Sequence, residues 1–199
     1  MLYLANASSP TVREAMLRGT LGQMVTPNEG RRPLPGVRFG ADNGCYSTHY
    51  VGDRRWMAWL DSLPREGCLL ATAPDVPADA AATLARSVPW LPVIASLGFP
   101  PALVAQDGLE HLDIPWDLCS VLFLGGTTTW KLGHAAALLA MEAHRRDRTV
   151  HMGRVNSARR WNYAHALGCS SVDGTFLAYA PDTNLRRMLR WSESSTTAP

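Results

Sequence analysis

The sequence predicts an α/β fold, a compact (β/α)₈ barrel of the TIM type, from three observations. Short apolar runs alternate with helical patterns along the whole chain, which is typical of a parallel sheet with crossover helices. Eight such runs follow one another in series. The chain has 199 residues, whereas a usual barrel has roughly 250, so we expect a pared-down version. An open, doubly wound sheet is the alternative fold with the same alternation.

The expected strands are short apolar runs, most of them followed by a polar residue or glycine. In chain order they cover residues 2–5, 23–25, 37–41, 68–72, 102–106, 120–124, 149–152 and 171–172. The second run is the weakest, because it leads into a loop rich in Gly, Pro and Arg at residues 27–35.

Helical patterns fill the intervals between these runs. We expect helices at about residues 9–18, 53–63, 78–86, 88–97, 131–145, 158–167 and 183–191. The run at 88–97 is ambiguous by periodicity, and we assign it to a helix because Pro89 and Pro92 are poor in a central strand. Residues 1–191 then form a single barrel domain, and residues 192–199 form a flexible C-terminal tail.

The composition is that of an ordinary globular protein. Hydrophobic residues make up 46% and charged residues 18%, which argues against disorder. No apolar stretch reaches the roughly 18 residues of a membrane span, and the N-terminus lacks the basic and apolar regions of a secretion signal. We therefore expect a cytoplasmic protein with no membrane partner. The four cysteines form no CxxC pair, so no metal or cofactor is expected.

Basic residues gather in the last third of the chain, although the net charge is only +2. Of the 19 basic residues only Lys131 is a lysine, and arginines crowd this region at positions 145, 146, 148, 154, 159, 160, 186, 187 and 190. A single basic face would suit phosphates. A scattered, solvated surface is the alternative.

The most informative pattern is the set of residues at the expected strand ends. They are, in chain order, Asp42, Asp75, Gln106, Gly125-Gly126, Met152 and Asp173. In a barrel the carboxyl ends of the strands share one face, where catalytic groups lie. Three carboxylates that converge there are costly without a substrate or donors, so convergence indicates a site. The alternative is that each aspartate only caps the next helix.

Six short motifs follow one another at these strand ends. They are Asp42-Asn43-Gly44-Cys45-Tyr46, Asp75, Val104-Ala105-Gln106-Asp107-Gly108, Leu124-Gly125-Gly126, His151-Met152-Gly153 and Val172-Asp173-Gly174. In this order they resemble the motifs of the tRNA-guanine transglycosylase family, namely its DSGG-aromatic motif, a base-recognising aspartate, its VQG, LGG and LMG motifs, and a nucleophilic aspartate. Together they span about residues 37–175.

The resemblance implies a mechanism of base exchange on a nucleic acid. Asp173 would attack the anomeric carbon and hold a covalent glycosyl intermediate, and Asp42 would shuttle protons. The purine edge would be read by Asp75, Gln106 and the Gly125-Gly126 backbone, next to Asn43. Tyr46 and Met152 would sandwich the flat ring.

The sequence departs from the tRNA enzymes because it has no cluster of three cysteines and a histidine like their zinc site after the barrel. It is therefore more similar to the short phage and bacterial branch that inserts 7-deazaguanine bases into DNA, the 7-deazaguanine DNA transglycosylases. The segments His151–Ser157 and Ser171–Thr175 carry this closer likeness. The resemblance implies DNA and a 7-deazaguanine base as substrates, with Arg154, Lys131, Arg159 and Arg160 as candidates for holding phosphates.

Other functions remain open at this point. They are the same exchange on tRNA, a non-catalytic barrel subunit that binds nucleic acid, and an unrelated small-molecule enzyme with a phosphate at Gly125-Gly126. An aspartate at position 173 argues against the non-catalytic subunit. Homodimers are common in the family, but no apolar stripe in the sequence marks an interface.

Overall fold

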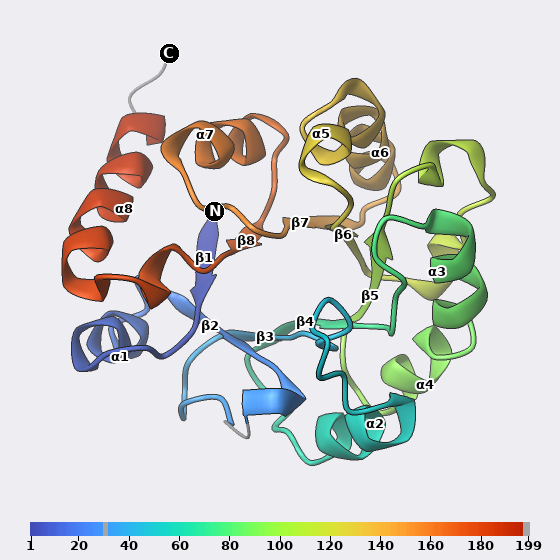
Figure 1. The fold of residues 1–199 in the computed structure, drawn as a ribbon, viewed down its shortest axis with the longest axis horizontal. Helices are drawn as coiled ribbons and strands as arrows, with labels where there is room; N and C mark the ends of the chain where they lie inside the picture. The colour runs from blue at the N-terminus through green and yellow to red at the C-terminus, as the bar shows by residue number, and fades with distance from the viewer. Residues whose placement is uncertain (30–31, 197–199) are drawn as a thin grey trace.

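A computed structural model describes residues 1–29 and 32–196 of the chain (Figure 1). Eight parallel strands, β1 to β8, close into a barrel in sequence order. Each strand pairs with its successor, and β8 returns to pair with β1, where Leu2 lies opposite Ser171 and Leu4 opposite Asp173. The closure confirms the barrel and excludes the open sheet.

All eight strands lie within a residue or two of their predicted positions. They are β1 (Leu2–Ala5), β2 (Gly22–Val25), β3 (Phe39–Ala41), β4 (Cys68–Thr72), β5 (Pro101–Ala105), β6 (Val121–Leu124), β7 (Thr149–Met152) and β8 (Ser171–Asp173). The last strand runs one residue further than predicted. Asp173 is therefore held by the sheet itself instead of a loop.

Helices form a ring outside the barrel (Figure 1). They are α1 (Pro10–Leu17), α2 (Asp53–Asp61), α3 (Ala80–Ser87), α4 (Leu91–Ser96), α5 (Thr128–Lys131), α6 (His134–Arg145), α7 (Ala158–Ala166) and α8 (Pro181–Thr196). Four short 3₁₀ turns join them, η1 (Pro27–Glu29), η2 (Leu109–His111), η3 (Trp116–Leu118) and η4 (Phe176–Ala178). In the described part of the chain, no helix has the length and apolar character needed to span a membrane.

Side-chain caps fix where several of these helices begin. Ser9, Asp79 and Ser157 accept hydrogen bonds from the backbone N–H groups of Val12, Ala82 and Arg160, three residues further on. Such a cap supplies a partner to one of the orphan donors of the first turn.

Two predicted boundaries are wrong. The helix expected over residues 131–145 is interrupted after Lys131, because Gly133 has extended backbone and begins α6 as its N-cap. The expected tail is also shorter, because α8 continues to Thr196 and residues 192–196 are helical. The remaining tail residues, 197–199, lie outside the described residues.

The buried apolar residues form two separate clusters. The smaller fills the barrel interior and consists of Leu2, Leu4, Met24, Leu70, Ala102, Val104, Val121 and Phe123. The larger lies between the outer face of the sheet and the helices. Side chains alternate between these two cores along each strand, so a residue's parity decides whether it faces the barrel axis.

Candidate active site at the carboxyl end of the barrel

A cavity of about 440 Å³ lies at the carboxyl ends of the strands. Every strand contributes residues to it from its end or the loop that follows. These include Asn6 after β1, Thr26 after β2, Asp42 after β3, Asp75 after β4, Gln106 after β5, Gly125 after β6, Gly153 after β7 and Gly174 after β8. This is the face on which barrel enzymes build active sites.

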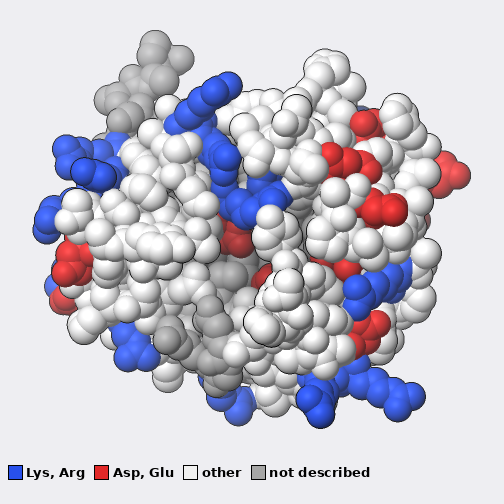
Figure 2. All heavy atoms as spheres, viewed as in Figure 1, with Lys and Arg blue, Asp and Glu red and all other residues white. Residues whose placement is uncertain are grey.

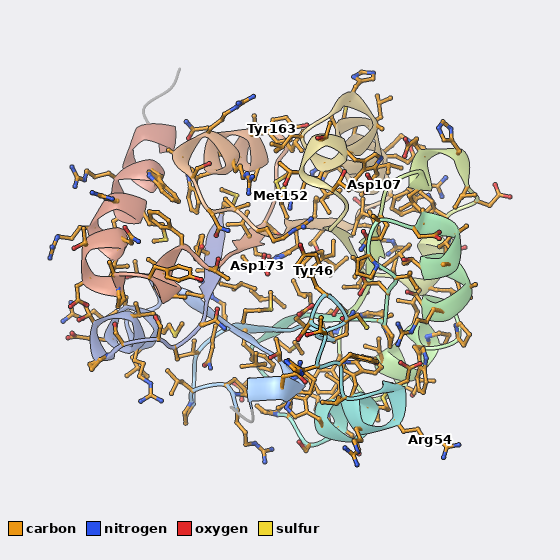
Figure 3. The ribbon with its side chains drawn as sticks, viewed as in Figure 1. Tyr46, Arg54, Asp107, Met152, Tyr163 and Asp173 are labelled. Carbon is orange, nitrogen blue, oxygen red and sulfur yellow. The ribbon has the colours of Figure 1, made fainter. Side chains whose placement is uncertain are left out.

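The aspartates at positions 42, 75 and 173 all line this one cavity. Figure 3 shows Asp173 and Tyr46 both near the middle of the barrel, and Figure 2 shows acidic atoms near the middle of this face with basic atoms above them. The capping alternative fails for the first two, since α2 begins after Gly52 and α3 after Asp79. The predicted convergence is confirmed.

Asp42 is a carboxyl that holds its proton to unusually high pH. Burial, followed by the negative charges of Asp173 and Asp75, raises its pKa to about 7, while hydrogen bonds from Gly44 and Thr72 offset part of the rise. The backbone N–H of Gly44 lies 3.3 Å from Oδ2, and the hydroxyl of Thr72 lies 3.4 Å from Oδ1. Asp42 is therefore partly protonated at neutral pH and suited to proton transfer.

Asp173 has a different set of neighbours. Burial raises its pKa to about 6, and the Arg154 backbone N–H and the cations of Lys131 and Arg154 limit the rise. The Arg154 N–H donates to Oδ1 across 2.7 Å. Asp173 is thus the more readily ionised of the two carboxyls, and the cations stand on its side of the cavity.

Asp75 is held by two amide side chains. Asn43 Nδ2 donates to Oδ1 across 2.9 Å, and Gln106 Nε2 donates to Oδ2 across 2.6 Å. The backbone N–H groups of Cys45 and Ala78 donate to the oxygens of these two amides, which fixes their orientation. Burial raises the pKa of Asp75 and the two amides offset this. Each carboxyl oxygen can still accept one more hydrogen bond, from an N–H group of a ligand.

The Gly125-Gly126 turn also lines the cavity, next to Gln106. A Cβ at Gly125 would stand 2.6 Å from Val104 Cγ1, so only glycine fits this close approach. The carbonyl oxygens of both glycines accept hydrogen bonds from the Arg154 guanidinium. The turn therefore reaches the cavity as predicted, but Arg154 occupies its carbonyl groups.

Tyr46 closes part of the cavity mouth together with Arg154. Its ring is 72% exposed, and the Arg154 guanidinium carbon lies 5.0 Å from the ring centroid. The β3–α2 and β7–α7 loops thus meet over the site through a cation–π contact. The guanidinium covers one face of the ring.

Met152 does not face the cavity, and this part of the prediction is wrong. It is fully buried among the apolar residues between sheet and helices. The reason is parity, because its strand neighbour His151 points into the barrel and Met152 must point outward. The structure offers Phe123 and Val104 as apolar cavity residues in its place.

The predicted basic residues separate into three environments. Lys131 is fully buried and donates to the carbonyl of Gly153, so it is not a phosphate contact. Burial and the nearby Arg154 lower its pKa to about 7. Arg160 is half-buried and donates to the Arg154 carbonyl across 2.9 Å, whereas Arg159 is exposed. Only Arg159 stands on an open surface as expected.

His151 is a further residue of the site, to which the sequence motifs gave no role. Its imidazole is fully buried inside the barrel below Asp173, and its Nε2 lies 4.0 Å from Oδ1 of that residue. Strand parity could have identified His151 from the sequence. Ser171 and Asp173 share one face of β8, and His151 pairs with Ser171, so its side chain lies on the same face of the sheet.

The comparisons with known proteins concern the fold. No family model and no curated protein matches the chain. The Amycolatopsis orientalis BexX/CysO complex is similar with a TM-score of 0.57 and 14% identity, over 99% of this chain and 91% of that one. The 3-hexulose-6-phosphate synthase of Salmonella typhimurium has a TM-score of 0.54 and 14% identity, over 98% and 99%. At this identity the likeness shows the barrel fold alone.

Among the described residues, no three His, Cys, Asp or Glu side chains are grouped in a way that could hold a metal ion. The cysteines at positions 45, 68, 119 and 169 are all free thiols. The cavity offers the carboxyl groups of its aspartates, the amides of Asn43 and Gln106, and the guanidinium of Arg154.

Proposed function

We propose that this protein is a glycosyltransferase that exchanges guanine in DNA for a 7-deazaguanine derivative through a covalent intermediate on Asp173. The observation that carries the proposal is a pair of unequal carboxyls in one cavity, with the pKa of Asp42 at about 7 and that of Asp173 at about 6. Such a pair supplies an acid and a nucleophile at the same pH. The order of motifs supplies the substrate class.

In the first displacement, Asp173 uses a carboxylate oxygen to attack C1′ of the target nucleotide. The bond between C1′ and N9 of guanine breaks, and its electron pair leaves with the base. Asp42 donates its proton to the departing base and becomes ionised. The product is a glycosyl ester on Asp173.

In the second displacement, a 7-deazaguanine takes the place of the departed guanine. Its N9 gives its proton to the Asp42 carboxylate and bonds to C1′, while the ester bond to Asp173 breaks and returns its electrons to that carboxylate. Both aspartates regain their starting states. Two displacements at the same carbon retain its configuration.

Base recognition falls to the buried network opposite Arg154. The Asp75 carboxyl, held by Asn43 and Gln106, accepts from the N–H groups of the guanine edge. Tyr46 stacks on one face of the base after the Arg154 guanidinium moves. In a DNA duplex the guanine must first leave the stack, which costs a few kcal/mol.

The alternative with a phosphate at Gly125-Gly126 fits less well. The N-terminus of α5 already holds the Asp107 carboxylate, which accepts from the backbone N–H and the hydroxyl of Thr127 across 2.6 Å each. A second anion there would meet this charge. We therefore favour a nucleoside substrate over a sugar phosphate.

One experiment separates base exchange on DNA, exchange on tRNA and a non-catalytic role. The protein is incubated with duplex DNA or with tRNA, and with radiolabelled guanine or a 7-deazaguanine. We expect label to enter DNA, and we expect Asp173→Asn to abolish this incorporation while the circular dichroism spectrum is unchanged. Asp107→Asn is the matched control. Asp107 contacts Thr127 beside the Gly125-Gly126 turn and does not line the cavity, so we expect this variant to keep its activity.

The other outcomes reject the proposal in different ways. Label in tRNA alone would show that the protein catalyses the same exchange on tRNA and not on DNA. No label in either, with intact binding of DNA, indicates the non-catalytic barrel. Label incorporated equally by wild type and Asp173→Asn excludes the covalent mechanism.

A further inference from the structure

His151 is a buried imidazole that the mechanism above does not use. It lies in β7, fully buried, with its ring centroid 4.5 Å from that of Phe123. Its Nδ1 lies 2.8 Å from Ser171 Oγ. Its Nε2 is buried without a hydrogen-bond partner among the described residues and is directed at Asp173, 4.0 Å from Oδ1.

An unpartnered buried ring nitrogen is costly unless another state of the protein uses it. The only carboxylate within salt-bridge distance of this nitrogen among the described residues is that of Asp173. The partner therefore lies in the site itself. The two atoms are further apart than in a hydrogen bond, and catalytic hydrogen bonds are often long before substrate binds.

The tautomer of the ring follows from its neighbours. Burial and the Lys131 charge lower the pKa of His151 to about 3, so the imidazole is neutral and has one N–H group. With the proton on Nδ1, a lone pair on Nε2 would face the Asp173 carboxylate. With the proton on Nε2, the ring donates toward Oδ1 and the Ser171 hydroxyl donates to Nδ1. The second arrangement gives both buried groups a complementary partner.

We infer that His151 is a positioning residue for Asp173, oriented by Ser171, whose Nε2–H holds Oδ1 and stabilises the ionised carboxylate. The Arg154 backbone N–H donates to the same oxygen across 2.7 Å. With Oδ1 held by two donors, Oδ2 is left for bond formation. The part of this inference that concerns attack on a sugar rests on the proposed function. The coupling between His151 and Asp173 does not.

Other groups also act on the Asp173 carboxyl and must stay constant in a test. They are Lys131 from α5, Arg154 from the β7–α7 loop, Asp42 after β3, and Tyr3 from β1, whose own pKa is raised by burial and by Asp173. None of them is altered by a substitution at position 151. Phenylalanine is the substitution of choice, because it keeps a flat ring against Phe123 and removes both nitrogens.

The test is a carboxyl ¹³C NMR titration of the resting protein labelled at aspartate, with the Asp173 signal assigned by its loss in Asp173→Asn. We expect His151→Phe to raise the pKa of Asp173 by about one unit, a tenfold change, because a donor to the charged form is lost. His151→Gln, which keeps an N–H donor, should reverse part of the shift. The control His165→Phe, at an exposed position of α7, should leave it unchanged.

An unchanged Asp173 pKa in His151→Phe overturns the inference. Should that variant fail to fold, ¹⁵N NMR of the wild-type imidazole decides instead. A proton on Nε2 supports the inference, and a proton on Nδ1 overturns it. The acid limb of the exchange rate should also move to higher pH in His151→Phe, with KM retained. If the wild-type protein shows no exchange activity, only the proposed function is overturned. The coupling between His151 and Asp173 is still tested, because neither NMR measurement needs a substrate.

Discussion

Asp42 and Asp173 are the same residue type in different surroundings, and the proposed mechanism gives them different tasks. Asp42 has two other carboxyls as its strongest charged neighbours, whereas Asp173 has Lys131 and the guanidinium of Arg154. Negative neighbours hold a proton on the first, and positive neighbours favour charge on the second. This asymmetry is the reason why the proposed mechanism uses Asp42 as the acid and Asp173 as the nucleophile.

The rate of base exchange should therefore depend on pH as a narrow bell. Activity is lost below about pH 6, where Asp173 binds a proton, and above about pH 7, where Asp42 loses its proton. Asp42→Asn should remove the alkaline limb and lower kcat by about 10²-fold. A pH–rate profile of both proteins checks this. An alkaline limb that persists in Asp42→Asn would contradict the assignment.

The same pKa shift has a consequence for stability. The pKa of Asp42 is raised from 3.8 to about 7 in the folded protein, so the unfolded chain ionises first. The free energy of unfolding contributed by this group is highest at acid pH and falls as pH rises from about 4 to 7. Asp42→Asn should therefore stabilise the protein at pH 8 by about 1–2 kcal/mol and give little gain at pH 4. Urea unfolding at the two pH values measures the difference; equal gains would contradict the argument.

At the scale of elements, β7 and β8 decide which side chains reach the site. Polar and apolar residues alternate in both strands, as Thr149-Val150-His151-Met152 in β7 and Ser171-Val172-Asp173 in β8. His151 and Asp173 face inward, whereas Met152 and Val172 belong to the outer core. This parity could therefore be read from the sequence once the strands were placed. Met152 was misassigned and His151 missed because the likeness to the LMG motif, and not the strand period, decided which residue was expected to face the site.

Glycines in β2 and β3 should matter for a related reason. A Cβ at Gly22 would stand 2.8 Å from the backbone oxygen of Arg38 and 2.4 Å from Leu4 Cδ2, so the neighbouring strand must move. A Cβ at Gly40 meets only side chains, Leu4 at 2.9 Å and the flexible Met24 at 3.1 Å. We expect Gly22→Ala to destabilise by about 3 kcal/mol and Gly40→Ala by about 1 kcal/mol. Chemical denaturation of the pair tests the order, and the reverse order would contradict the packing described for the barrel.

At the scale of the whole molecule, the closed barrel brings together residues that are 131 positions apart in sequence, from Asp42 to Asp173. Strand ends marked by Asp, Gln and Gly sufficed to predict which residues meet. They could not predict the Arg154 contacts, because these depend on a loop residue with positive φ (58°) and on carbonyl groups that any residue provides. The buried place of Lys131 likewise depends on the break before α6.

The proposed binding of nucleic acid would also depend on the assembled surface. Arg159 is exposed at the start of α7, near the cavity but outside it. If it neutralises one phosphate, Arg159→Ala should weaken DNA binding for all sequences and reduce the slope of log K against log salt by about 1. Exchange at saturating DNA should be unaffected. Fluorescence anisotropy between low and moderate salt checks the slope, and Arg13→Ala on α1 serves as the control.

The most direct test of the account is the mass of the protein trapped during turnover. Wild-type protein mixed with guanine-containing oligonucleotide, without a second base, and quenched in acid should carry the oligonucleotide through a glycosyl ester. Peptide mapping should place it on Asp173, and Asp173→Asn should carry none. An adduct on another residue, or turnover without any adduct on Asp173, would contradict the account.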